Sequence, residues 1–237
     1  RGVPTENVIV DNCKVFKGHG GFVVGSEMSG GVRNISVSNC LFMGTDVGLR
    51  FKSNRGRGGV VENIYIDGIS MFDIVTDSFL FDLYYGGKSA SESLEDGDVT
   101  PKESLIPSVS EETPIFRNIF VKNLVSRNAR RAMFFNGLPE MNIKNIIVEK
   151  TSISSKFGAE LSESDGVEFR DVVICPAEGS PLKLNNVKNM VIRSAVNYDK
   201  SKALVEISGS STKGIVLPES TKLKLNGVSE NVVSFIK

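Results

Sequence analysis

The chain contains 237 residues, with 28 basic and 28 acidic side chains and a formal net charge of zero. A chain of this length can bury one sizeable core without disulfides or a bound metal. The balanced charge argues against a generally basic nucleic-acid surface or a polybasic membrane surface, so no nucleic-acid partner is expected. No apolar run approaches the ~18 residues of a membrane-spanning helix.

One short phrase recurs along the chain, made of a polar residue and an asparagine followed by an apolar, a variable and an apolar residue. The five clearest copies, starting at residues 6, 33, 62, 117 and 144, are ENVIV, RNISV, ENIYI, RNIFV and KNIIV. Weaker copies start at residues 165, 188 and 213. The steps between the five asparagines are 27, 29, 55 and 27 residues, and a period of this size indicates a solenoid.

Each phrase predicts a strand with one buried face, because apolar and variable residues alternate. Further β-like runs, such as 21–25, 47–51, 78–82 and 131–135, lie between the phrases, with Gly, Asn, Ser and Asp at the corners. A repeat this short cannot bury its apolar face alone. The pattern therefore predicts an all-β fold, a right-handed parallel β-helix of about eight coils that forms a single domain over residues 1–237.

The recurring asparagine is expected at one corner of successive coils. There its side-chain amide can bond to the asparagines above and below, which satisfies polar groups that the sheet does not reach. A simpler explanation is that asparagine tolerates a left-handed backbone conformation. The repetition at one phase favours the ladder of side chains.

The 55-residue step marks an insertion in one coil. Residues 86–114 are polar, rich in serine and acidic, and their removal restores the ordinary repeat. We expect an inserted solvated loop, with a rim that limits access to a cleft as the functional alternative.

Three cysteines are present. Cys13 and Cys40 lie at matching places in two repeats, whereas Cys175 stands alone. We expect small buried apolar residues, although stacked cysteines on adjacent strands would lie near bonding distance. The chain has one histidine and no Cys-x-x-Cys, so no metal site and no cofactor are expected.

The chemistry is expected between residues 18 and 52. His19 lies between Gly18 and Gly20, which leave the imidazole open on both sides. Arg50 and Lys52 alternate with a phenylalanine, so a strand would present both cations on one face. Such a pair can hold a carboxylate, and a step of 31 to 33 residues brings it one coil away from His19.

These motifs resemble the polygalacturonase-like pectinases of glycoside hydrolase family 28. Gly-His-Gly at 18–20 matches the third motif block of the family, and Arg-Phe-Lys at 50–52 matches the fourth, Arg-Ile-Lys. The resemblance is specific from about residue 3 to residue 85. It implies an inverting hydrolase of galacturonate chains in which Arg50 and Lys52 bind the sugar carboxylate and His19 supports the catalytic carboxylates.

The resemblance also implies a tyrosine that contacts the substrate ring about one coil further on. Tyr85 is the first candidate and Tyr84 the second, with an aromatic stack on the coil surface as the structural alternative. Glu27 and Arg55 are further candidates for the edge of the site. An acidic plant polysaccharide or oligosaccharide is the expected partner, and a secreted or periplasmic location is expected.

The first two family blocks, Asn-Thr-Asp and Asp-Asp, carry the catalytic aspartates and are missing from residues 1–17. We therefore expect a carboxy-terminal part of such an enzyme, truncated at its amino-terminal side and inactive alone. Self-association, or coils missing from the amino-terminal end, would then cover the exposed apolar face. A non-catalytic carbohydrate-binding or structural β-helix is the alternative, and a β-helix polysaccharide lyase is a weaker one.

Overall fold

The computed structural model describes residues 2–86, 106–194, 196–197, 199 and 204–236. Within these residues the chain forms fifteen strands and one short 3₁₀ helix. The elements are β1 (Thr5–Asp11), β2 (Lys14–Phe16), β3 (Gly20–Val24), β4 (Val32–Met43), β5 (Val47–Lys52), β6 (Val60–Phe72), β7 (Asp77–Asp82), β8 (Ile115–Asn136), β9 (Ile143–Ser162), β10 (Ser164–Asn185), β11 (Val191–Ile192), β12 (Leu204–Ser208), β13 (Ile215–Pro218), β14 (Lys222–Asn226), η2 (Glu230–Val232) and β15 (Val233–Ile236).

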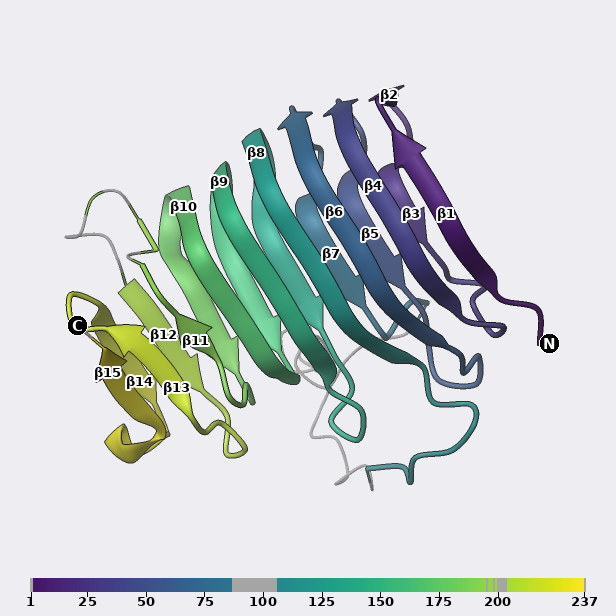
Figure 1. Ribbon diagram of the computed structural model, residues 1–237. Helices are drawn as coiled ribbons and strands as arrows, with labels where there is room; N and C mark the ends of the chain where they lie inside the picture. The colour runs from purple at the N-terminus through teal and green to yellow at the C-terminus, as the bar shows by residue number, and fades with distance from the viewer. Residues whose placement is uncertain (1, 87–105, 195, 198, 200–203, 237) are drawn as a thin grey trace.

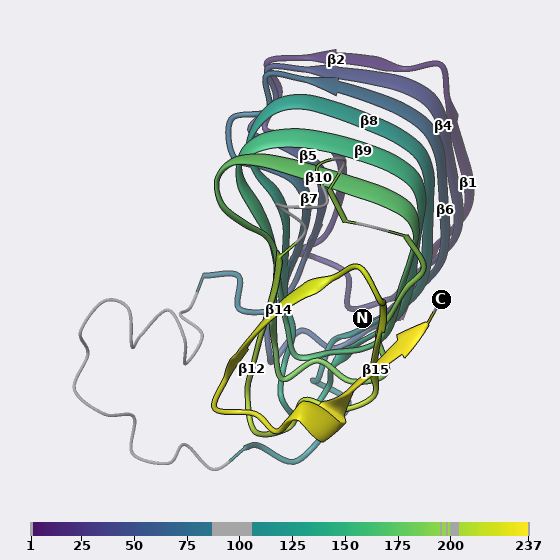
Figure 2. The ribbon, with the colours of Figure 1, turned by 90° about the vertical axis from the view of Figure 1, so that its left-hand side faces the viewer.

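The strands pair in parallel along the axis of a coil stack (Figure 1). One path runs β1-β4-β6-β8-β9-β10-β11-β13-β15, and a second face runs β3-β5-β7 and joins β8. The predicted all-β, right-handed parallel β-helix is confirmed, whereas the number of coils stays a prediction. The sequence predicted separate strands for the phrases and for the β-like runs between them, but β8, β9 and β10 bend continuously around the core, as Figure 2 shows.

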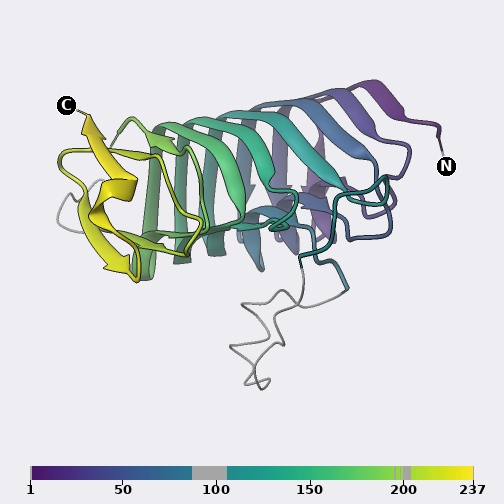
Figure 3. The same cartoon turned by 90° about the horizontal axis from the view of Figure 1, so that it is seen from below.

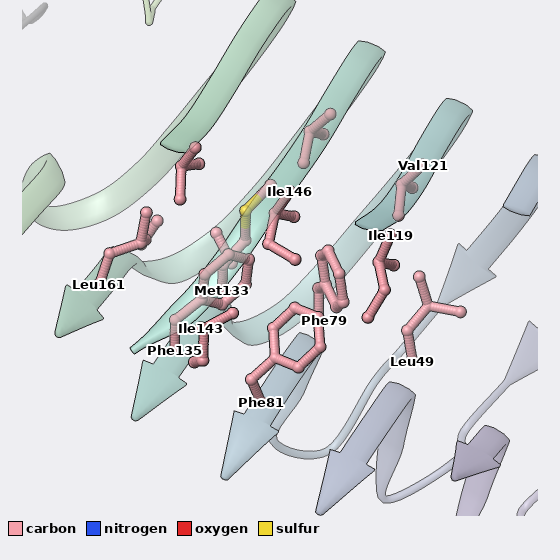
Figure 4. Close-up of a cluster of buried hydrophobic side chains, with 14 of the residues drawn as sticks. Leu49, Phe79, Phe81, Ile119, Val121, Met133, Phe135, Ile143, Ile146 and Leu161 are labelled. Carbon is pink, nitrogen blue, oxygen red and sulfur yellow. The ribbon is translucent and has the colours of Figure 1, made fainter. Parts of the chain in front are cut away.

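The core consists of apolar side chains stacked in rows from coil to coil. Phe51, Phe81 and Phe135 occupy one register position of β5, β7 and β8, and their ring centroids are 4.8 Å apart at each step. All three are fully buried, and Figure 4 shows how such side chains converge inside the coils. The spacing equals the distance between neighbouring strands, ~4.8 Å, so each ring packs on the next without a gap.

The asparagine ladder is present as predicted. Each amide donates to the side-chain oxygen of the preceding coil, at 3.2 Å from Asn34 to Asn7 and 3.4 Å from Asn63 to Asn34. The series continues at 3.5 Å from Asn118 to Asn63 and 3.2 Å from Asn145 to Asn118. All five residues also have φ between 53° and 57°, so the ladder and the left-handed backbone occur together at the same corner.

The predicted insertion at 86–114 lies largely outside the described residues. Its last turn is fixed, because the carbonyl of Glu112 accepts hydrogen bonds from the amides of Gly56 and Gly58 at 3.0 and 2.9 Å. The amide of Ile115, which begins β8, donates to the carbonyl of Gly59 at 3.0 Å. The loop at 53–59 therefore lies directly beside the carboxy-terminal end of the insertion.

The cysteines are all unpaired. Cys40 is buried as expected, but Cys13 is exposed, because it lies at the outer edge of the coil stack, and Cys175 is partly exposed. Among the described residues, no helix has the length and apolar character needed to cross a membrane. In the same part of the chain, no cluster of three or more His, Cys, Asp or Glu side chains could hold a metal ion.

Candidate active site

The predicted site lies on the outer face of β5, between β3 and β7. Figure 3 shows the coil stack that carries these strands, seen from below. Arg50 is paired with Val23 of β3 and Leu80 of β7, and Lys52 with Asp82 of β7. Phe51 points inward and is fully buried, which leaves the two cations on the opposite face of the strand. The alternation expected from the sequence is therefore present.

His19 contacts both neighbouring charged groups. Its Nε2 lies 2.8 Å from Nη1 of Arg50, and its Nδ1 lies 3.2 Å from Oδ2 of Asp46. Arginine can only donate, so Nε2 accepts from Arg50 while Nδ1–H donates to Asp46, and one tautomer satisfies both contacts. Asp46 Oδ2 also lies 3.7 Å from Nη1 of Arg50. The imidazole thus bridges the guanidinium and the carboxylate.

Arg50 is unusually enclosed for an arginine on an outer strand face. Its side chain is 11% exposed, and its Nε, although buried, has no hydrogen-bond partner among the described residues. Two other such atoms lie just after β5, the hydroxyl of Ser53 and the amide oxygen of Asn54. Buried polar groups are nearly always satisfied by protein or ordered water, and these three atoms are too enclosed to contact a ligand directly.

Tyr85 closes the site from the next coil. Its ring centroid lies 4.2 Å from Nζ of Lys52 and 5.8 Å from the guanidinium carbon of Arg50. Its backbone is fixed by hydrogen bonds to Ser53 (3.1 Å) and from the Asn54 amide (3.2 Å). The structure therefore brings His19, Arg50, Lys52 and Tyr85 together, with one face of the tyrosine ring against the cations.

Arg55 and Tyr84 form a separate cluster with Glu140. Arg55 binds Glu140 through two hydrogen bonds, from Nε at 2.5 Å and Nη2 at 2.8 Å, and its guanidinium lies 5.1 Å from the Tyr84 ring centroid. Burial acts to raise the pKa of Glu140, but the hydrogen bonds and charge of Arg55 outweigh it and lower that pKa overall. Burial raises the pKa of Tyr84. This cluster ties the loop after β5 to the turn after β8.

Glu27 lies in a third position, an open groove of about 530 Å³ that is also lined by Ser29, Gly56 and Arg57. Its carboxylate forms an ion pair with Arg57, whose Nη1 also donates to the hydroxyl of Ser26 at 2.9 Å. Glu27 is thus paired across two loops, apart from the contacts that join His19 to Arg50.

The sequence interpretation did not assign Asp46, Arg57 or Glu140 to the site. A signal for Asp46 was available, because the 27-residue step between the first two asparagines leads from His19 directly to Asp46. No comparable signal exists for Glu140, which is 85 residues from Arg55 and belongs to a turn. Chemically, the cluster around β5 offers two cations and an aromatic ring, which suits a single carboxylate with an attached ring.

Comparisons with known proteins agree with the motifs. Residues 3–103 match the family described as "Glycosyl hydrolases family 28". The resemblance to glycoside hydrolase family 28 is confirmed. The family match begins where the motif resemblance begins and contains His19, Arg50, Lys52 and Tyr85.

Two curated relatives illustrate the similarity. A polygalacturonase from Ralstonia solanacearum is 33% identical over 150 residues, which cover 60% of this chain and 24% of that protein. An exo-poly-alpha-D-galacturonosidase from Dickeya chrysanthemi is 22% identical over 191 residues, covering 80% of this chain and 30% of that protein. The chain thus spans roughly a quarter of the length of the curated relatives that it matches.

A solved structure shows the same fold. The crystal structure of a hyperthermoactive exopolygalacturonase from Thermotoga maritima matches with a TM-score of 0.51 and 26% sequence identity. The match covers 80% of this chain and 35% of that protein. The parallel coils of this chain therefore correspond to about a third of that larger protein.

Proposed function

We propose that this chain is the substrate-binding part of a glycoside hydrolase that cleaves galacturonate-containing pectic polysaccharide by an inverting mechanism. The observation that carries the proposal is the placement of Arg50 and Lys52 on one outer strand face, with His19 and Tyr85 against them. Arg50 and Lys52 bind the carboxylate of one galacturonate unit, the arginine through its guanidinium and the lysine as a point charge. A secreted or periplasmic location follows from the same proposal.

Inversion requires a carboxylic acid that protonates the leaving oxygen and a carboxylate that activates water, with the two groups about 6.5–9.5 Å apart. Asp46 is the carboxylate that contacts His19, and it is already engaged by the imidazole and by Arg50. We therefore place the catalytic aspartates upstream of residue 1 and assign His19 a supporting role. It holds Arg50 and Asp46 in the geometry that the substrate meets.

Binding of tetragalacturonate to the 237-residue chain tests the carboxylate site. Replacement of Lys52 by Ala removes a charge-assisted contact worth about 1.5–3 kcal/mol, which corresponds to roughly a 10- to 150-fold weaker affinity in calorimetry. Lys122→Ala is the matched control, because Lys122 pairs with Glu149 at 3.6 Å on another face of the coils. An equal loss of affinity in both variants, or no loss of affinity in Lys52→Ala, would show that Lys52 does not bind the carboxylate.

A non-catalytic carbohydrate-binding β-helix is the second candidate, favoured by the engagement of Asp46 in ion pairs. Release of reducing ends from polygalacturonate distinguishes the two candidates when the chain and its full-length parent are compared. The hydrolase proposal requires activity of the parent and none of the chain alone. Inactivity of the parent supports the binding protein instead, and comparable activity of both would place the catalytic carboxylates within the chain. Self-association of the chain stays a prediction.

A further inference from the structure

Two of the three cysteines lie at equivalent positions of neighbouring coils. The parallel pairing of β1 and β2 with β4 keeps the same offset of 27 residues before and after these cysteines. Cys13 therefore lies opposite Cys40, and the Cys13 carbonyl accepts a hydrogen bond from the amide of Leu41 at 2.9 Å. Neither the proposed function nor the family motifs uses the two thiols.

The two thiols make matching contacts in their coils. The Cys13 thiol donates to the carbonyl of Asp11 at 3.5 Å, and the Cys40 thiol donates to the carbonyl of Ser38, the corresponding group one coil further on, at 3.0 Å. The hydroxyl of Ser38 also donates to Oδ1 of Asp11 at 2.6 Å, which holds the register of the two coils at this corner. Equivalent contacts on paired strands thus bring the two sulfur atoms side by side.

The spacing of the backbones fits a disulfide bond. Neighbouring parallel strands are ~4.8 Å apart, and disulfides usually join Cα atoms that are about 4.4–6.8 Å apart. Among the described strands, β1 and β2 each pair with β4 alone. The corner that carries Cys13 can therefore adjust toward Cys40 without displacing a strand on its other side.

The third cysteine has no such partner. Cys175 of β10 is paired with Ser154 of β9. Four strand spacings, about 19 Å, separate β4 from β10 along the axis, and β1 lies one spacing further away. Of the three cysteines, only Cys13 and Cys40 can therefore be joined within one folded chain.

The paired thiols differ in their access to solvent. Cys13 is exposed, whereas Cys40 is 3% exposed. Burial is the main cause that raises the pKa of the Cys40 thiol, and a side-chain hydrogen bond with Cys13 adds to it. Cys13 is thus the thiol that an oxidant in solution can reach, and Cys40 is the thiol that already contacts Cys13.

We propose that Cys13 and Cys40 form a disulfide bond when the chain meets a small-molecule disulfide as the oxidant. The Cys13 thiolate attacks one sulfur of the oxidant and displaces the first small thiol. The Cys40 thiolate then attacks Sγ of Cys13 in the mixed disulfide and displaces the second. One disulfide of the oxidant is thereby reduced to two thiols, which take up the two electrons and two protons that the cysteines lose.

The bond ties the coil of β1, β2 and β3 to the coil that follows it. The first of these coils carries His19, which contacts Arg50 of β5. A secreted or periplasmic chain meets oxidising conditions, in which such a bond persists. The cross-link also restricts the unfolded chain, so the oxidised chain should unfold at a higher urea concentration than the reduced chain.

Oxidised glutathione tests the proposal with the 237-residue chain. We expect the wild type to lose two of its three thiols, counted with a chromogenic thiol reagent after denaturation, and to migrate as a single chain in a non-reducing denaturing gel. Peptide mapping should identify a link between Cys13 and Cys40. Cys175→Ser is the matched control and should form the same link, whereas Cys40→Ala should stop at a mixed disulfide of glutathione with Cys13.

The inference is overturned if the wild type keeps all three thiols, or if Cys13 ends bound to glutathione or to a second chain. A link that includes Cys175 overturns it as well. So does an oxidised wild type that unfolds at a lower urea concentration than the reduced form, because the folded coils would then not accommodate the bond. Circular dichroism establishes that Cys40→Ala retains the fold, and the wild-type thiol count and peptide map decide the outcome without that variant.

Discussion

The ion pair between Arg55 and Glu140 is expected to be a strong local contribution to stability. The two side chains join the loop after β5, which carries Ser53 and Asn54 beside the candidate site, to the turn after β8. The carboxylate of Glu140 is 4% exposed, whereas the side chain of Arg55 is 38% exposed. Removing Arg55 therefore leaves a buried side chain unpaired, whereas removing Glu140 leaves unpaired a side chain that solvent already reaches.

The geometry sets the size of the effect. Exposed pairs contribute about 0–1 kcal/mol, and breaking a fully buried pair costs about 3–5 kcal/mol. With one partner buried and two short hydrogen bonds, we expect a coupling energy of about 2 kcal/mol between Arg55 and Glu140. Arg55→Ala should destabilise more than Glu140→Ala, because it leaves a buried carboxylate unpaired whereas the arginine can be solvated.

A double-mutant cycle by urea unfolding measures this coupling. The pair of Glu6 and Arg33 is the control, since its contact distance is 2.6 Å but both side chains are at least 36% exposed. We expect a coupling of about 0.5 kcal/mol there. If the Arg55–Glu140 coupling does not exceed that of the control, the burial of Glu140 does not strengthen the pair and the reasoning is wrong.

Two further predictions concern the coils. A Cβ atom at Gly48 would lie 2.5 Å from the carbonyl oxygen of Ser78. Gly48→Ala should therefore lower the free energy of unfolding, measured by urea titration, by about 1–3 kcal/mol. An unchanged unfolding midpoint would contradict this prediction. Hydrogen bonds from Arg170 and Arg193 lower the pKa of Glu168 to about 2, below its ordinary 4.5, so its stabilisation is present above pH 4.5 and lost as pH falls toward 2. Glu168→Gln should therefore lose less stability between pH 5 and 2.5 than wild type, and identical losses would refute the assignment.

The repeat made much of the fold predictable from the sequence. A phrase that recurs with an asparagine at one phase determines the corner of each coil, because every coil must turn there with the same left-handed conformation. A step of 31 residues, close to the repeat period, predicts that His19 and Arg50 lie on neighbouring coils, and their contact of 2.8 Å confirms this. The repeat period was sufficient for both predictions, because residues about one repeat apart in the sequence lie on neighbouring coils.

Contacts that depend on side-chain direction or on distant turns were not predictable. Arg55 was expected at the edge of the site, but its guanidinium turns toward Glu140, which no motif marks. A cleft of about 510 Å³ on the outer face of the coils is lined by residues as far apart as Thr76 and Lys183, and the 55-residue step interrupts the repeat between them. Only the pairing of the folded strands brings these residues together, so no short sequence pattern predicts the cleft.

The outward positions of four successive strands form an unbroken row along the axis, occupied by Arg50, Leu80, Phe134 and Glu160 of β5, β7, β8 and β9. Strands along the axis are separated by ~4.8 Å. A turn can therefore lengthen without changing the distance between Arg50 and Glu160. Gain or loss of a whole coil between β5 and β9 would change this distance by about 4.8 Å, so the number of coils sets the spacing of outward side chains along the axis.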